Sequence, residues 1–94
     1  MNIQALIASK KGTIVDVRTD IEFGEAHAEG AINIPVYDFA DKIDEIKHLE
    51  MPIILCCASG GRSNQAFRYL SQLGINCVDA GPWTNIYHYQ TQKQ

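Results

Sequence analysis

The residues with the clearest chemical potential lie in one short run, Cys57-Ala58-Ser59-Gly60-Gly61-Arg62-Ser63. An apolar stretch of strand type, residues 52–56, precedes this run, and a helical pattern over residues 64–73 follows it. A strand, a short loop of small residues and a helix together direct several backbone N–H groups and a helix N-terminus at one point. Because a cysteine stands at the start of the loop, the anion held there can be a thiolate.

Cys57 is therefore predicted to be a nucleophile. A nest of N–H groups at a helix N-terminus lowers a thiol pKa, and Arg62 adds positive charge. Ser63 can cap the helix or donate a hydrogen bond, while a glycine pair lets the backbone curl at positive φ. We predict Cys57 as the catalytic residue and the rest of the loop as substrate-binding: Ala58, Ser59, Gly60, Gly61, Arg62 and Ser63. The alternative is a plain strand-to-helix turn with an inert buried cysteine.

Loop length indicates the size of the guest. Four residues separate Cys57 from Arg62, whereas cysteine phosphatases, which resemble this layout, carry five and make room for a tetrahedral phosphate. The shorter loop suits a smaller guest, such as an extra sulfur atom on Cys57. A Walker-type phosphate loop fits less well, because the first glycine and the lysine are missing.

The surrounding elements alternate between strand and helix. Apolar runs predict strands over residues 13–17, 31–34, 53–56 and 75–78. Helical spacing predicts a short helix capped by Asn2 and stopped at residues 10–12, then helices over residues 22–26, 38–50, 64–73 and 83–89. Such alternation is typical of an α/β fold: a small central parallel sheet of about four to five strands with helices on both faces. We expect one domain over residues 1–94, with residues 90–94 frayed.

Ligands of parallel sheets bind beyond the carboxyl ends of the strands, and Cys57 follows one such end. Asp16 and Arg18 follow another, so they either line the pocket or have structural roles. We favour the structural interpretation, with Arg18 paired to Glu22 at i,i+4 spacing and Asp16 bound to nearby backbone. His27 lies in a turn without a neighbouring acid, which also favours a structural role.

Several other residues are assigned to packing or turns. Cys56 and Cys77 lie inside apolar runs, where cysteine behaves as a small hydrophobe. The Gly81-Pro82 pair is predicted to turn into the last helix. Trp83 and Tyr87 can shape the rim of the pocket, but we favour roles in the core or in helix packing.

Composition excludes several classes of function. The net charge is −3 and the cations are scattered, which argues against nucleic-acid and membrane partners. The three cysteines are too few for a disulfide scaffold, and neither their spacing nor that of the histidines matches metal ligands, so no metal or cofactor is expected. No signal peptide is visible, and we expect a cytoplasmic location.

Three stretches together resemble the single-domain rhodanese-type sulfurtransferases: Ile14-Val15-Asp16-Val17-Arg18 with Glu22-Phe23, residues 27–35 (His-Ala-Glu-Gly-Ala-Ile-Asn-Ile-Pro), and Cys57 to Ser63. Gly81 and Trp83 are similar to residues of the closing turn in that family. The resemblance implies transfer of a sulfane sulfur from a donor such as thiosulfate to a thiol or cyanide through a Cys57 persulfide, and the acceptor can be a protein thiol. Arg62 is the one cation of this loop, whereas some members carry a further basic residue that engages thiosulfate.

Three alternatives remain open at this point. The chain can be a sulfur carrier, a non-catalytic rhodanese-like interaction module, or a cysteine phosphatase or arsenate reductase of the related loop type. The physiological donor, the acceptor and the oligomeric state are not specified by these residues.

Overall fold

Four parallel strands in the order β2-β1-β3-β4 form the centre of the molecule. The computed structural model describes residues 2–92. Its elements are α1 (Ile3–Ser9), β1 (Thr13–Asp16), α2 (Asp20–Glu25), β2 (Ile32–Asn33), the 3-10 helix η1 (Val36–Asp38), α3 (Phe39–Lys47), β3 (Ile53–Cys57), α4 (Gly61–Gln72), β4 (Cys77–Pro82) and α5 (Trp83–Thr91). The predicted α/β fold with a small parallel sheet is confirmed.

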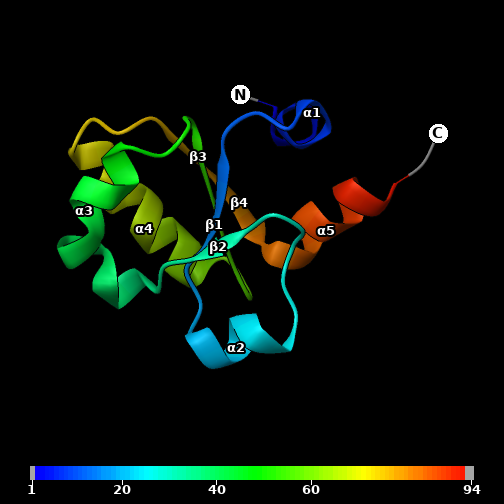
Figure 1. Cartoon of the computed structure of the whole chain (residues 1–94), viewed down its shortest axis with the longest axis horizontal. Coiled ribbons are helices and arrows are strands. Elements are labelled where there is room, and N and C mark those ends of the chain that lie inside the picture. Colours follow the sequence, from blue (N-terminus) through cyan, green and yellow to red (C-terminus); the bar gives the residue numbers. More distant parts are fainter. Residues whose placement is uncertain (1, 93–94) are drawn as a thin grey trace.

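Helices cover both faces of the sheet, as predicted. In Figure 1, α3 and α4 lie on one side of the strands, and α1 and α5 lie on the other. Each side has its own apolar core, and the buried strand β3 supplies both. Ile53, Leu55 and Cys57 belong to the core under α3 and α4, whereas Ile54 and Cys56 belong to the core under α1 and α5. The strand pleat therefore separates the two adjacent cysteines.

The carboxyl edge of the sheet is where α2 lies. Figure 1 shows α2 below the ends of β1 and β3, separate from the two helical layers. Thr19 caps α2 and Glu22 completes a capping box, which explains why the helix begins at Asp20 rather than at Glu22. Of the described residues, none lies in a helix long and apolar enough to span a membrane.

The end of β4 differs from the sequence prediction. Gly81 and Pro82 were predicted to form a turn, but they are the last two residues of β4 and pair with Cys56 and Cys57. Asp79 pairs with Leu55, so Ala80 is an extra residue in the ladder, a bulge that apolar patterning does not reveal. The carboxylate of Asp79 accepts a hydrogen bond from the Gly81 amide at 2.9 Å, which holds this bulge.

Helix ends also differ in places. α3 ends at Lys47 rather than Glu50, and α5 continues to Thr91, past the Gln90 where we expected fraying to begin. The Gln90 side chain explains this extension: its amide donates to the Glu29 carbonyl at 2.8 Å and its oxygen accepts from the Glu29 amide at 2.9 Å. Residues 93 and 94 of the predicted frayed tail lie outside the described residues.

Substitution of Gly12 by alanine is expected to lower the free energy of unfolding by about 1–3 kcal/mol. Gly12 has φ +84°, and a Cβ there would overlap the carbonyl oxygen of Pro52. Gly24→Ala is the matched control, because a Cβ at Gly24 meets nothing within 4 Å. Alanine in that helical position is expected to stabilise the protein by up to about 1 kcal/mol. Urea denaturation of both variants measures the difference, and equal stabilities would contradict the role assigned to Gly12.

Candidate active site

Cys57 is the last residue of β3 and its side chain is fully buried. Gly60 follows at φ 106° and caps α4, which begins at Gly61 rather than at Asn64. The connection between strand and helix is therefore residues 58–60, and Arg62 and Ser63 belong to the first turn of the helix. This short connection turns the N-terminus of α4 back toward the cysteine sulfur.

Three hydrogen bonds converge on the Cys57 sulfur. The Gly60 amide donates to Sγ at 3.0 Å and the Ser63 amide donates to Sγ at 3.3 Å. The Ser63 hydroxyl lies 3.4 Å from Sγ. Burial acts to raise the pKa of the Cys57 thiol, but the Ser63 hydroxyl and the amides of Ser63, Gly60 and Ser59 outweigh it, so this pKa is lowered. The loop favours the thiolate.

Ser63 can serve both protonation states of the cysteine. In the thiol state, Sγ donates to Ser63 Oγ, and that hydroxyl donates to the Gly60 carbonyl at 3.1 Å. When Cys57 loses its proton, the single hydroxyl proton of Ser63 can turn to the sulfur. The Gly60 carbonyl keeps a partner in that arrangement, because it also accepts from the Asn64 amide at 3.0 Å.

Replacing Ser63 by alanine is expected to slow alkylation of Cys57 at neutral pH by about tenfold, the size of one hydrogen bond to a charged group. The pKa of Cys57 rises in this variant, so the rate lost at neutral pH returns at high pH. Iodoacetamide rates measured across a pH series test this. Ser59→Ala is the matched control, because Ser59 acts on the sulfur through its backbone amide. An unchanged pH profile in Ser63→Ala would contradict the prediction.

Arg62, the loop cation, is held by Glu22. Its Nη1 and Nη2 donate to the two carboxylate oxygens of Glu22 at 2.7 and 3.0 Å, a bidentate pair between α4 and α2. The hydrogen bond from Arg62, followed by that from the Thr19 backbone, lowers the pKa of Glu22 to about 2. The predicted pairing of Glu22 with Arg18 is wrong. Glu22 was not among the predicted site residues, although the Thr-x-x-Glu spacing of its capping box was a signal that its position is fixed.

Arg18 pairs with Asp16 instead. Arg18 Nη2 lies 2.8 Å from Asp16 Oδ2, and Arg18 Nε contacts both carboxylate oxygens at 3.0 Å. As predicted, Asp16 also binds nearby backbone, accepting from the Arg18 amide. Arg18 reaches the Ala26 carbonyl at 2.7 Å, and its guanidinium lies 5.0 Å from the ring centre of Trp83. These contacts tie the end of β1 to α2 and α5.

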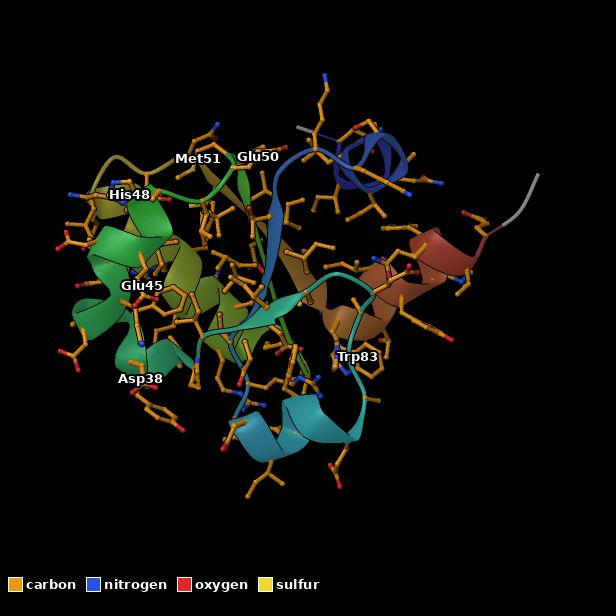
Figure 2. The ribbon with its side chains drawn as sticks, viewed as in Figure 1. Asp38, Glu45, His48, Glu50, Met51 and Trp83 are labelled. Carbon is orange, nitrogen blue, oxygen red and sulfur yellow. The ribbon has the colours of Figure 1, made fainter. Side chains whose placement is uncertain are left out.

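Figure 2 places Trp83 at the start of α5, on the α2 side of the molecule, whereas Glu50 and Met51 lie at the opposite end of the sheet. Asp16, Arg18 and Trp83 thus lie at the same carboxyl edge as Cys57 and support its surroundings.

His27 is exposed; its Nδ1 lies 2.7 Å from the Phe23 carbonyl and its ring stacks on Phe23. Those contacts give His27 a local structural role.

The other two cysteines have different surroundings. Cys56 is buried in the core under α1 and α5, and burial raises its pKa. Cys77 is half-buried in β4, near the Phe67 carbonyl and the Ser71 hydroxyl. Within residues 2–92, no three His, Cys, Asp or Glu side chains are grouped to hold a metal ion.

The fold and the site define an α/β protein with a hydrogen-bonded cysteine between a central parallel strand and a helix N-terminus. The chain belongs to the rhodanese-like domain family, whose model matches residues 2–90. This confirms the resemblance seen in the sequence.

Individual relatives agree with this assignment. The chain is 31% identical over 75 residues to a protein named sulfurtransferase from Allochromatium vinosum, covering 80% of this chain and 69% of that protein. It is 30% identical over 66 residues to the thiosulfate sulfurtransferase PspE of Escherichia coli, covering 69% of this chain and 64% of PspE. It spans only 26% of a third relative, the tRNA uridine(34) hydroxylase of Buchnera aphidicola, at 28% identity over 82% of this chain.

A solved structure supports the same fold. The rhodanese-related protein of Thermoplasma volcanium superposes with a TM-score of 0.76 at 28% identity, covering 96% of this chain and 91% of that protein. The four-stranded sheet and its helical layers are therefore shared over nearly the whole length of both chains.

Proposed function

We propose that the protein is a sulfurtransferase that carries sulfur as a persulfide on Cys57. The observation that carries this proposal is the pair of hydrogen bonds that the Gly60 and Ser63 amides donate to Cys57 Sγ, which stabilise a thiolate in a buried position. The names sulfurtransferase and thiosulfate sulfurtransferase borne by two relatives support the same reaction class. The loop that follows, Ala58, Ser59, Gly60, Gly61, Arg62 and Ser63, is the proposed binding site for the transferred sulfur.

The first half-reaction loads the cysteine. The Cys57 thiolate attacks the outer sulfur of a donor such as thiosulfate, and a bond forms between Sγ and that sulfur. The bond between the outer sulfur and the rest of the donor breaks, and its electron pair leaves with sulfite. The product is a Cys57 persulfide anion, so no external oxidant or reductant is needed.

The second half-reaction unloads the sulfur. An acceptor thiolate or cyanide attacks the outer sulfur, and the electron pair of the S–S bond returns to Cys57 Sγ. The Gly60 and Ser63 groups then stabilise the thiolate as it leaves, which lowers the barrier electrostatically. Sγ itself is buried, whereas the added sulfur extends about 2 Å farther from the strand. An acceptor is therefore directed to the outer sulfur.

A phosphatase reaction is disfavoured by the position of the loop arginine. Both Nη atoms of Arg62 are bound to Glu22, so its guanidinium does not present a free fork to a phosphate at the sulfur. The same chain should therefore hydrolyse no aryl phosphate.

Intact-mass spectrometry tests the proposal. Treatment of the reduced protein with thiosulfate, or with the persulfide of a small thiol, is expected to add one sulfur atom, and cyanide or a thiol is expected to remove it. Tandem mass spectra of the peptide that contains Cys57 locate the sulfur. Failure of every donor to add sulfur, with alkylation of Cys57 intact, would overturn the proposed function.

A further inference from the structure

The loop cation and an acid from another element form a pair with no net charge. Arg62 and Glu22 meet through two hydrogen bonds of 2.7 and 3.0 Å, although forty positions separate them in the chain. Their side chains are 37% and 33% exposed, so the pair lies at the surface of the protein rather than inside the core. Glu22 neutralises the single positive side chain of the loop.

Glu22 is held in place independently of Arg62. Its Oε1 atom accepts from the Thr19 amide at 3.1 Å and lies 3.0 Å from the Thr19 hydroxyl. The bond from the Thr19 amide, together with the one from the Glu22 amide to the Thr19 hydroxyl, forms the capping box of α2, so the carboxylate is positioned before any pairing with α4. Arg62 therefore has a fixed acceptor, and moving its guanidinium toward a bound ligand requires breaking two charge-assisted hydrogen bonds.

A second ion pair at this edge of the sheet, the buried pair of Asp16 with Arg18, is also neutral overall. Among the described groups that contact the sulfur, those that can attract an anion belong to the N-terminus of the twelve-residue helix α4 and include the Gly60 and Ser63 amides. A helix N-terminus corresponds to about half a positive charge. This partial positive charge can stabilise one negative charge on a sulfur, but it is too small to balance the two charges of a dianion.

We propose that Glu22 is a specificity-determining residue that cancels the charge of Arg62 and so favours monoanionic sulfur donors, the persulfides of small thiols, over dianionic thiosulfate. This inference rests on the proposed function and narrows its substrate class. Glu22 acts through Arg62 and is a positioning residue rather than a catalytic one.

Two alkylating agents of different charge test the role of Glu22 without any sulfur chemistry. Iodoacetate is an anion and iodoacetamide is neutral, so the ratio of their second-order rate constants at Cys57 reports the local potential. In Glu22→Gln at low ionic strength, this ratio is expected to rise about three- to tenfold over wild type, since one positive charge is uncovered. The glutamine oxygen can still accept from the Thr19 amide, which preserves the helix cap.

Glu25→Gln is the matched control, because Glu25 is an exposed residue of the same helix and its substitution changes net charge equally. Its ratio is expected to stay within about twofold of wild type, as for a screened surface charge. Arg62→Gln leaves Glu22 unpaired and is expected to lower the ratio. The double variant Glu22→Gln/Arg62→Gln is expected to return to the wild-type value. Equal ratios in Glu22→Gln and Glu25→Gln, or a raised ratio that persists in the double variant, would overturn the role of Glu22.

Donor kinetics supply the second readout. In wild type, kcat/KM is expected to be higher for a small-thiol persulfide than for thiosulfate, and Glu22→Gln should shift this preference toward thiosulfate by about three- to tenfold. A preference for thiosulfate in wild type, or no shift in the variant, would overturn the assignment of donor class. Absence of sulfur loading from every donor would overturn the proposed function and the donor class with it, whereas the alkylation ratios decide separately whether Glu22 cancels the charge of Arg62 at Cys57.

Discussion

Replacement of Cys57 by alanine is expected to abolish sulfur loading and to reduce sulfur transfer at least about 10³-fold, to the uncatalysed background. Neither of the other two cysteines, both among the described residues, has the required surroundings. Cys56 faces the opposite core and burial raises its pKa, while Cys77 lies in β4 without the helix N-terminus that serves Cys57. Intact mass after donor treatment and a steady-state transfer assay measure the two losses.

Two matched variants distinguish the loss of the nucleophile from the general effect of losing a cysteine side chain. Cys77→Ala is expected to load sulfur as wild type does. Cys56→Ala removes a fully buried side chain and is expected to lower stability by about 1 kcal/mol while loading sulfur normally when folded. Sulfur transfer that survives in Cys57→Ala, or is lost in Cys77→Ala, would contradict the assignment.

Replacement of Arg18 by methionine is expected to lower the free energy of unfolding by about 3–5 kcal/mol. Asp16 is fully buried, and Arg18 is the cation that compensates it within the described residues. The methionine fills a similar space but leaves a carboxylate inside the protein without its counter-charge. Because a small domain has about 5–15 kcal/mol of stability in all, this loss is a large fraction. Urea denaturation followed by circular dichroism measures it.

An exposed ion pair provides the control for Arg18→Met. Lys42 and Glu45 form a surface pair at 3.6 Å, and Lys42→Met is expected to change stability by less than about 1 kcal/mol. The double variant Asp16→Asn/Arg18→Met, which leaves no buried charge, is expected to recover part of the lost stability. A single Arg18→Met variant as stable as Lys42→Met would contradict the importance of the buried pair.

The parts of the fold that follow from local pattern were predictable. The buried strand β3, the strand–helix alternation and the Asn2 cap, whose side chain accepts from the Ala5 amide at 3.1 Å, all follow from short-range rules. The end of β4 could not be predicted in this way, because Gly81-Pro82 is typical of a turn and only pairing with β3 keeps it in the sheet. Local turn preference was overridden by tertiary pairing.

The charges of the site were the hardest feature to predict. Spacing within the chain favoured Arg18 with Glu22, but tertiary structure exchanged the partners: Arg18 binds Asp16 and Glu22 binds Arg62. Which acid meets which base depends on how α2 lies against α4, and no periodicity in the sequence encodes that. Cys57 could be proposed as a site residue from the sequence because its loop is continuous in the chain, whereas Glu22 reaches the same loop from a distant element.

The pleat of β3 also has a consequence for the lifetime of the proposed Cys57 persulfide. If two adjacent cysteines faced the same way, the second thiol could attack the persulfide of the first, release hydrogen sulfide and leave a disulfide that ends the cycle. Here the side chains of Cys56 and Cys57 enter different cores, and the raised pKa of Cys56 keeps it protonated. A sulfur carried on Cys57, as proposed, would therefore be kept from the thiol of Cys56, and its lifetime would depend on acceptors that bind from outside.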